Sequence, residues 1–148
     1  MSDLAGYFAQ APAITQHRPW PRVELDAAGW HALVEQLARE PWELTALWAD
    51  PPAIHVCLRD AETGTLIVAS HATPDGAYES LGRVRPSALR LERAARDLFG
   101  LVAEGTPDSR PWLDHGRWPM RMPLGTNPVP RRLDEPAARA VDYLSPIH

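Results

Sequence analysis

The sequence predicts an α+β fold, a two-layer sandwich of a small, mainly antiparallel sheet with about two helices and an extended proline-rich C-terminal tail. Two stretches, 27–39 and 86–99, have helical patterns, and about four short segments before residue 71 alternate like strands. Half of the sixteen prolines lie after residue 100. We therefore expect an irregular lead-in at 1–21, a folded domain at 22–105 and the tail at 106–148.

The first predicted helix, 27–39, follows a short strand at 22–26. Asp26 is a natural N-cap, because its carboxylate can accept hydrogen bonds from backbone N–H groups of the first helical turn. Pro41 ends the helix, since a proline disfavours helical geometry in the residue before it. Four apolar residues recur at the spacing of one helical face: Trp30, Leu33, Val34 and Leu37.

Three further strands are predicted from apolar alternation at 42–49, 54–58 and 65–70. A five-residue loop containing a glycine joins the last two, which is typical of a hairpin. In the first of these strands, Trp42 and Trp48 fall on the same alternating face. We expect both tryptophans to be buried in the core, because this alternation is typical of a half-buried strand.

The second predicted helix, 86–99, begins with Pro86 or Ser87 in its first turn, where the missing N–H of proline does no harm. Gly100 stands where a helix commonly ends on a left-handed residue. Its narrow apolar stripe consists of Ala88, Leu91, Ala95 and Leu98. Two charge pairs at i,i+4 spacing, Glu92–Arg96 and Arg93–Asp97, can face the segment that returns after Gly100. We expect at least one of Glu92, Arg93 and Asp97 to pair with the tail.

Composition excludes several functional classes. The net charge is −4, with arginine as the only strongly basic residue type, so neither a lysine Schiff base nor a P-loop lysine is possible. The overall charge does not favour nucleic acid as a partner. The single cysteine, Cys57, cannot form an intrachain disulfide or supply four thiolates to an iron-sulfur cluster. No stretch approaches a membrane span or a signal peptide, so we expect a cytoplasmic protein without membrane insertion.

Three other hypotheses about function follow from individual residues. His115 beside Asp114 is a candidate general base for a small standalone enzyme. His55 and Cys57 share one face of a predicted strand, and with His71 on the next strand they are candidate metal ligands. The arginines of the second helix could contact phosphates, although acidic residues interrupt them.

A more specific indication comes from spaced motifs around the second helix. The motif residues are Leu91-Glu92-Arg93, Asp97-Leu98-Phe99-Gly100, Glu104-Gly105 and Pro107-Asp108-Ser109-Arg110. This pattern resembles the family of the 30 kDa subunit of NADH-quinone oxidoreductase (complex I). The segment 111–118 is most similar to the version fused to the front of formate-hydrogenlyase-type nickel-iron hydrogenase large subunits. Ala94 replaces the family's second glutamate, and 122–125 replaces its basic segment, so partner contacts of that segment are not carried over.

The resemblance implies a non-catalytic accessory domain that helps to assemble an electron-transfer complex. Its expected partners are a hydrogenase-like large subunit and a small iron-sulfur subunit of the same complex. The iron-sulfur clusters and the nickel-iron or quinone site would lie on those partners, and this chain would hold no cofactor. We expect it at the cytoplasmic face of the inner membrane, attached through its partners.

Site residues are assigned on the same basis. The resemblance implies structural roles for the family-motif residues Glu92, Arg93, Asp97, Phe99, Gly100, Asp108 and Arg110. Five tail residues of types that often anchor interfaces are expected to bind the partner: Arg110, Trp112, His115, Arg117 and Trp118. We expect 107–130 to be only partly ordered in the isolated chain. The competing hypothesis is that the tail folds back over the sheet and completes the core.

Overall fold

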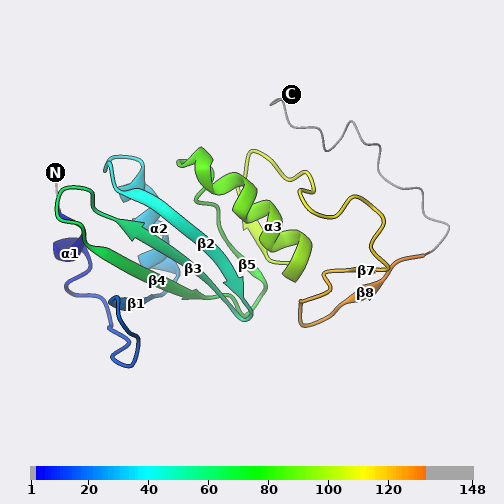
Figure 1. The fold of residues 1–148 in the computed structure, drawn as a ribbon, viewed down its shortest axis with the longest axis horizontal. Helices are drawn as coiled ribbons and strands as arrows, with labels where there is room; N and C mark the ends of the chain where they lie inside the picture. The colour runs from blue at the N-terminus through cyan, green and yellow to red at the C-terminus, as the bar shows by residue number, and fades with distance from the viewer. Residues whose placement is uncertain (1–2, 133–148) are drawn as a thin grey trace.

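The computed structural model describes residues 3–132 and contains a four-stranded sheet (Figure 1). Its strands are β1 (Arg22–Leu25), β2 (Glu43–Asp50), β3 (Ala53–Arg59) and β4 (Leu66–Ala72), in the order β1-β4-β3-β2. β1 pairs with β4 in parallel, and the other two pairings are antiparallel. The structure thus confirms the predicted mainly antiparallel sheet.

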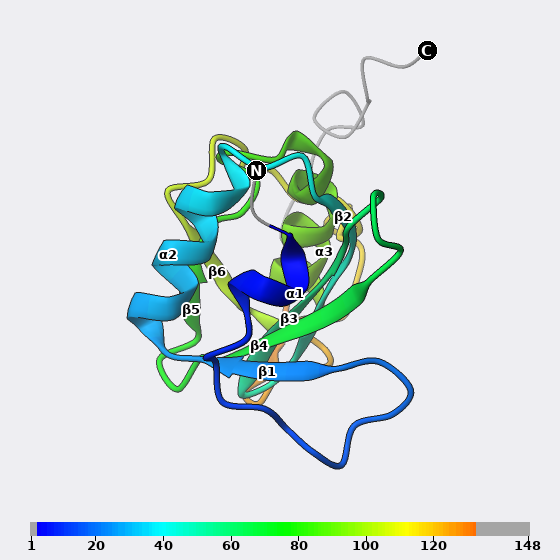
Figure 2. The same cartoon turned by 90° about the vertical axis from the view of Figure 1, so that its left-hand side faces the viewer.

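Helices lie against one face of this sheet. α2 (Ala27–Leu37) packs beside β1, and α3 (Leu89–Phe99), preceded by the 3₁₀ turn η1 (Pro86–Ala88), packs beside β2. Figure 2 shows α1 and α2 on the same side of the sheet, with α3 behind them. The arrangement is a two-layer α+β sandwich, as the sequence predicts.

The core forms where the apolar stripe of α2 meets a continuous row of strand residues. Asp26 caps α2 as predicted, its Oδ1 accepting a hydrogen bond from the Gly29 backbone N–H at 2.7 Å. The pairing registers place one small or branched residue from each strand side by side: Val23, Ala69, Val56 and Leu47. All four are buried, as are the four predicted stripe residues of α2. This row explains why the strands alternate, because every second residue contacts the helical layer.

The prediction that Trp48 belongs to the core is wrong. The pairing of β2 with β3 contains a bulge at Thr45, and the alternation beyond it is reversed. Leu47 and Ala49 therefore face the helices, while Trp48 is 40% exposed and stacks on His55 of β3. Trp42, which precedes the bulge, is buried as expected.

The lead-in is more ordered than its proline content indicates. It begins with a one-turn helix, α1 (Leu4–Tyr7), whose Leu4 is fully buried, and Phe8 joins the same core. The Leu4 N–H donates to Asp60 Oδ2 at 3.1 Å, which ties α1 to the β3–β4 hairpin loop. The segment then runs beside β1, where the Ile14 N–H donates to the Arg22 carbonyl at 2.8 Å.

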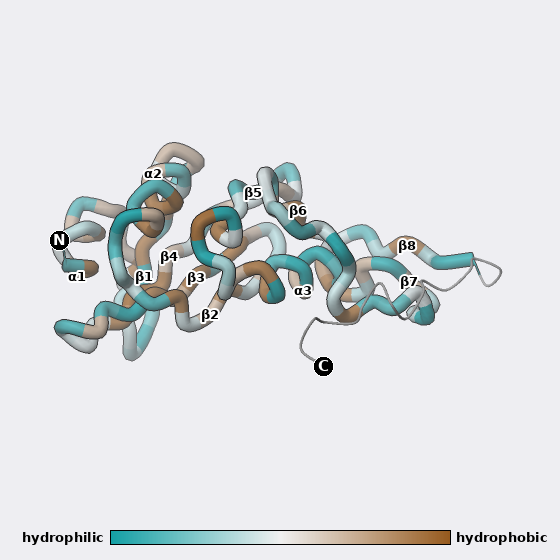
Figure 3. Tube along the Cα trace, turned by 90° about the horizontal axis from the view of Figure 1, so that it is seen from above, coloured by the Kyte–Doolittle hydropathy of each residue, from teal (hydrophilic) through white to brown (hydrophobic). Residues whose placement is uncertain are grey.

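Four short strands lie outside the predicted elements. β5 (Ala77–Glu79) and β6 (Val102–Glu104) form a parallel pair next to α3. β7 (Met120–Arg121) and β8 (Val129–Pro130) form a small antiparallel pair near the end of the described chain. In Figure 3, hydrophobic colour is concentrated in the sheet and α2, and hydrophilic colour predominates toward β7 and β8. Within residues 3–132, no helix is long and apolar enough to cross a membrane.

Candidate partner-binding surface

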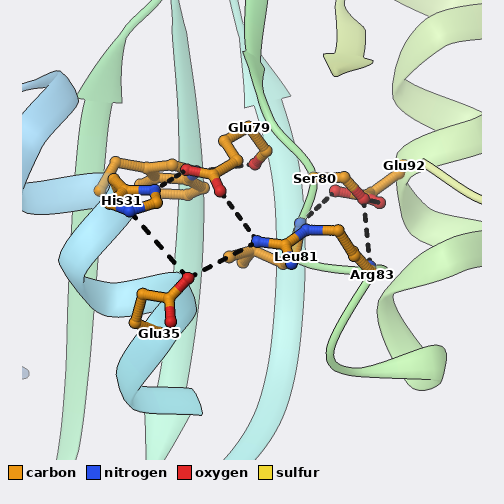
Figure 4. Close-up of polar contacts among 8 residues, drawn as sticks. His31, Glu35, Glu79, Ser80, Leu81, Arg83 and Glu92 are labelled. Atoms are coloured by element: carbon orange, nitrogen blue, oxygen red, sulfur yellow. Dashed lines mark hydrogen bonds and ion pairs between the residues drawn. The ribbon is translucent and has the colours of Figure 1, made fainter. Parts of the chain in front are cut away.

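The family-motif carboxylate Glu92 is buried inside the domain, with 2% of its surface exposed. Its Oε1 accepts hydrogen bonds from the Ser80 hydroxyl at 2.7 Å and the Gly82 N–H at 3.1 Å. Its Oε2 accepts one from the Leu81 N–H at 2.9 Å. These contacts tie α3 to the segment that follows β5 (Figure 4). Burial raises the pKa of Glu92, while its hydrogen-bond donors lower it in part.

These positions correct the predicted surface of α3. The sequence places Glu92 and Arg93 in i,i+4 charge pairs on a solvated face and places Leu91 in the apolar stripe. In the structure both charged residues are buried and have other partners, while Leu91 is 36% exposed. Ala88 and Ala95 of the predicted stripe are buried as expected, but Glu92 and Arg93 take part of the inner face in place of Leu91, because their buried hydrogen bonds anchor them there.

Arg93 connects α3 to the start of the tail. Its Nε donates to the Arg110 carbonyl at 2.7 Å, and its Nη2 donates to the Pro111 carbonyl at 2.8 Å. Its Nη1 also lies 3.4 Å from Asp108 Oδ2, which forms a charge-assisted hydrogen bond with the Arg110 side chain. Together these contacts lower the pKa of Asp108 to about 2, and the side-chain hydrogen bond from Arg110 is the largest cause.

Asp97, one helical turn further on, binds the next part of the tail. Its Oδ2 accepts hydrogen bonds from three successive backbone N–H groups, those of Trp112 at 2.7 Å, Leu113 at 2.6 Å and Asp114 at 3.1 Å. Three converging donors satisfy a carboxylate well, as in an anion-binding turn of the backbone. Arg93 and Asp97 thus fix the backbone of 110–114 through both its carbonyl and its N–H groups.

The Trp112 ring rests against the same helix. The guanidinium carbons of Arg90 and Arg93 lie 4.8 and 5.1 Å from its ring centroid, within the range of cation–π contacts. Trp112 is therefore half-buried, and part of its predicted interface area is used within the chain.

Asp114 and Arg131 hold the far part of the tail together. Arg131 forms two hydrogen bonds with the Asp114 carboxylate, at 2.6 and 2.9 Å, and also donates to the Trp118 carbonyl at 3.0 Å. The hydrogen bond from Arg131 is the largest cause that lowers the pKa of Asp114. The Asp114 carboxylate is thus engaged with Arg131 and also accepts a hydrogen bond from the Gly116 N–H at 2.9 Å, so it holds this part of the tail together.

The tail also packs against the C-terminal end of α3. Gly100 ends the helix in the left-handed conformation, with φ of 80°, as the sequence predicts. A Cβ at this glycine would lie 2.5 Å from Met122 Sδ, and the Leu124 N–H donates to the Leu98 carbonyl at 2.9 Å. The segment that replaces the family's basic stretch therefore packs on the end of α3.

The contacts leave a set of tail side chains on the outer surface. The exposed residues predicted for partner binding are Arg110, His115 and Arg117, while Trp112 and Trp118 are half-buried. Leu113, which no sequence pattern singles out, is 38% exposed between them. Leu124 and Val129 are further exposed apolar residues of the tail. We call the outer surface of 110–118 the tail face.

The candidate metal ligands do not converge. His55 and Cys57 lie on the face of the sheet opposite α2, whereas His71 lies on the helical side, where its Nδ1 contacts the Leu25 carbonyl at 2.9 Å. His55 Nδ1 is engaged with the Ser70 hydroxyl at 2.7 Å, and burial lowers the pKa of the ring. Within the described chain, no group of three or more His, Cys, Asp or Glu side chains could hold a metal ion.

A surface ionic network supports the other side of the Glu92 contacts (Figure 4). Arg83 Nη2 donates to Glu79 Oε1 at 3.0 Å, and His31 Nδ1 contacts Glu79 Oε2 at 2.8 Å. Glu35 of α2 lies 3.9 Å from Arg83 Nη2. The network joins α2 to the end of β5. Its members are largely exposed, so each pair contributes at most about 1 kcal/mol.

Gly82 is expected to be intolerant of even one added methyl group. A Cβ there would lie 2.5 Å from Leu89 Cδ2 and 2.6 Å from Glu92 Oε1, so Gly82→Ala should lower the free energy of unfolding by about 1–3 kcal/mol. Chemical denaturation measures this change. Gly29→Ala in α2 is the matched control, because its nearest contact is 3.2 Å and alanine favours a helix. Equal effects of the two substitutions would contradict the close packing at Glu92.

Comparisons with known proteins agree with this fold. The profile of a family described as the respiratory-chain NADH dehydrogenase 30 kDa subunit matches residues 25–131. No curated protein matches the chain. A trypsin-resistant fragment of Nqo5 is similar with 22% identity and a TM-score of 0.57, over 71% of this chain and 95% of that one. A chain of the membrane-bound sulfane sulfur reductase, an archaeal respiratory membrane complex, is similar with 16% identity and a TM-score of 0.56, over 75% and 74%.

Proposed function

Because the chain belongs to the respiratory-chain NADH dehydrogenase 30 kDa subunit family, we propose that it is a non-catalytic assembly subunit of a respiratory electron-transfer complex. The tail face would dock on a hydrogenase-like large subunit of that complex. The observation that carries this proposal is the way Arg93 and Asp97 fix the backbone of 110–114. A backbone held in advance loses little conformational freedom on binding, which favours a recognition surface.

The chemistry of the tail face suits a protein partner. Arg110, His115 and Arg117 are exposed in the same segment as the exposed Leu113, and a mixture of apolar and basic residues is typical of interfaces. The described part of the tail adds no residue to the buried core cluster, whose last member is Ala103. A partner can therefore contact this segment without displacing residues of the core cluster.

The same proposal places the cofactors of the complex on the partner subunits. The iron-sulfur clusters and the nickel-iron or quinone site would lie on the large subunit and on a small iron-sulfur subunit. The similarity of 111–118 to the hydrogenase-fused version favours a formate-hydrogenlyase-type hydrogenase, and the family itself includes subunits of NADH dehydrogenase. The chain would sit at the cytoplasmic face of the membrane, held there by its partners.

The proposal predicts a variant that folds but does not assemble. Leu113→Asp combined with Arg117→Glu should abolish co-purification with the large subunit, because it places two carboxylates on the tail face. Neither side chain contributes to the core, so the melting temperature should change by less than about 2 °C, since exposed substitutions typically cost under about 0.5 kcal/mol. Thermal melting and affinity capture of the complex measure the two quantities.

Arg39→Glu, at an exposed position just after α2, is the matched charge-reversal control. It should leave assembly intact. Normal recovery of the large subunit by the tail-face variant would contradict the proposed docking surface. Equal loss with both variants would show that net charge, and not the tail face, controls assembly.

A further inference from the structure

A cavity of about 450 Å³ lies between the lead-in and the sheet, formed by elements other than α3 and the tail. Val23 of β1 and Ile67 of β4 line it from the sheet, and Phe8 lines it from the end of α1. The loop between α1 and β1 supplies the rest of the wall. Figure 2 shows this loop extending beyond the edge of the sheet beside β1. The volume of the cavity is within the range of roughly 300–1,000 Å³ that small-molecule sites occupy.

The charged groups of the cavity have one sign. The titratable residues of its wall are His17, Arg18 and Arg22, and no aspartate or glutamate of the described chain lines it. This is unusual for a chain whose net charge is −4. A wall that carries only basic groups attracts an anion.

The Arg18 guanidinium has unused hydrogen-bonding capacity. Arg18 donates through Nη1 to the carbonyls of Thr15 and His17, at 2.8 and 3.3 Å. Arg22 donates through Nε to the Ser70 hydroxyl at 2.7 Å, on the face of the sheet that bears His55, so its guanidinium is turned away from the cavity. Among residues 3–132, the Nε and Nη2 of Arg18 have no hydrogen-bond acceptor. A carboxylate is the ligand whose geometry matches such donors.

The walls of the cavity are fixed before any ligand binds. The Ile14 N–H donates to the Arg22 carbonyl at 2.8 Å, and the Glu24 N–H donates to the Pro12 carbonyl at 2.9 Å. His17 Nδ1 lies 2.7 Å from the Trp20 carbonyl, and since a carbonyl only accepts, this nitrogen carries the proton. These bonds hold the loop against β1, which reduces the entropy lost on binding.

We propose that the cavity binds a small amphipathic anion, a molecule with an apolar body and one carboxylate or equivalent head. The apolar body lies against Phe8, Val23 and Ile67, and the head is bound by Arg18 at the basic side of the wall. The proposal is independent of the tail face, because it rests on a different part of the chain.

Titration of the full 148-residue chain with decanoate, followed by calorimetry and by amide chemical shifts, tests this proposal. We expect saturable binding with shifts confined to the lead-in, β1 and the start of β4. Arg18→Gln should raise the dissociation constant about tenfold, since it removes one charge-assisted hydrogen bond. Arg59→Gln, which removes a half-buried arginine that pairs with Glu43 outside the cavity, should leave the dissociation constant unchanged.

Two further comparisons test the contributions of the ligand's apolar body and of its charged head separately. Ala9→Phe should fill part of the cavity and abolish binding, whereas Ala61→Phe in the β3–β4 loop should have no effect. Decanol, a neutral molecule of the same length, should bind at least tenfold more weakly than decanoate. Absence of saturable binding at millimolar decanoate, equal affinity for decanol, or an unchanged dissociation constant for Arg18→Gln would each overturn the proposal.

Discussion

Replacing Glu92 by alanine is expected to lower the free energy of unfolding by about 3–5 kcal/mol. The substitution leaves the Ser80 hydroxyl and the N–H groups of Leu81 and Gly82 without their acceptor inside the domain. For a chain of this length, that loss corresponds to a fall in melting temperature of roughly 10 °C. Denaturant titration and thermal melting measure both quantities.

Glu92→Gln is the matched control, because it keeps the shape and one acceptor oxygen. With Oε1 retained, the bonds from Ser80 and Gly82 survive, and only the Leu81 N–H faces a donor instead of an acceptor. We expect a smaller loss of about 1–2 kcal/mol. Equal losses for alanine and glutamine would contradict the hydrogen-bonded role and indicate that only the charge matters.

The pH dependence gives an independent check of the same site. Burial raises the pKa of Glu92 above its ordinary value of 4.5. At a pH between 4.5 and the raised pKa, the folded chain therefore binds more protons than the unfolded chain. The contribution of Glu92 to stability is therefore full below pH 4.5 and declines as the pH rises through the raised pKa. Relative to Glu92→Gln, the wild-type chain should lose stability over this range. A difference that is constant with pH, or grows in favour of the wild type, would contradict the raised pKa.

The sequence predicts the regular parts of this fold because they depend on local periodicity. The stripe of α2, its Asp26 cap and the left-handed Gly100 are all readable from spacing within one element. Local alternation misplaces Trp48 because the bulge at Thr45 depends on pairing with β3, which no local pattern records. The strands β5 and β6 are three residues each, too short to show an alternation.

The candidate site shows the same limit. Spacing within α3 indicates i,i+4 pairs, but Arg93 and Asp97 bind residues 15 or more positions along the chain. Their partners are mainly backbone groups of the tail, which carry no side-chain signature in a sequence. Arg85 is a similar case, since its guanidinium binds the carbonyls of Leu37, at the end of α2, and of Glu40 and Trp42 in the loop that follows. The motif residues, and the pairing of at least one of them with the tail, could be predicted from the sequence, but the individual backbone groups that they bind could not.

Ending the chain after Gly105 should leave a folded domain that no longer joins its complex. The buried core cluster of the described residues ends at Ala103, and the tail attaches to α3 mainly through hydrogen bonds to Arg93 and Asp97. Removing the tail exposes both side chains to water, which replaces their lost partners. We therefore expect a loss of only about 1–3 kcal/mol in the free energy of unfolding, together with complete loss of co-purification with the large subunit.

Asp97→Ala in the 148-residue chain keeps the tail but weakens its attachment to α3, so it tests the attachment alone. It removes the acceptor for three N–H groups at 112–114, so hydrogen exchange at these amides should become fast while β3 stays protected. Assembly should weaken, because the tail face is no longer held in shape before it binds. Strong protection throughout 107–130 in this variant, with global unfolding of the truncated chain, would show instead that the tail belongs to the core. Intact folding and assembly of the variant, with turnover of the whole complex abolished, would assign Asp97 a direct chemical role.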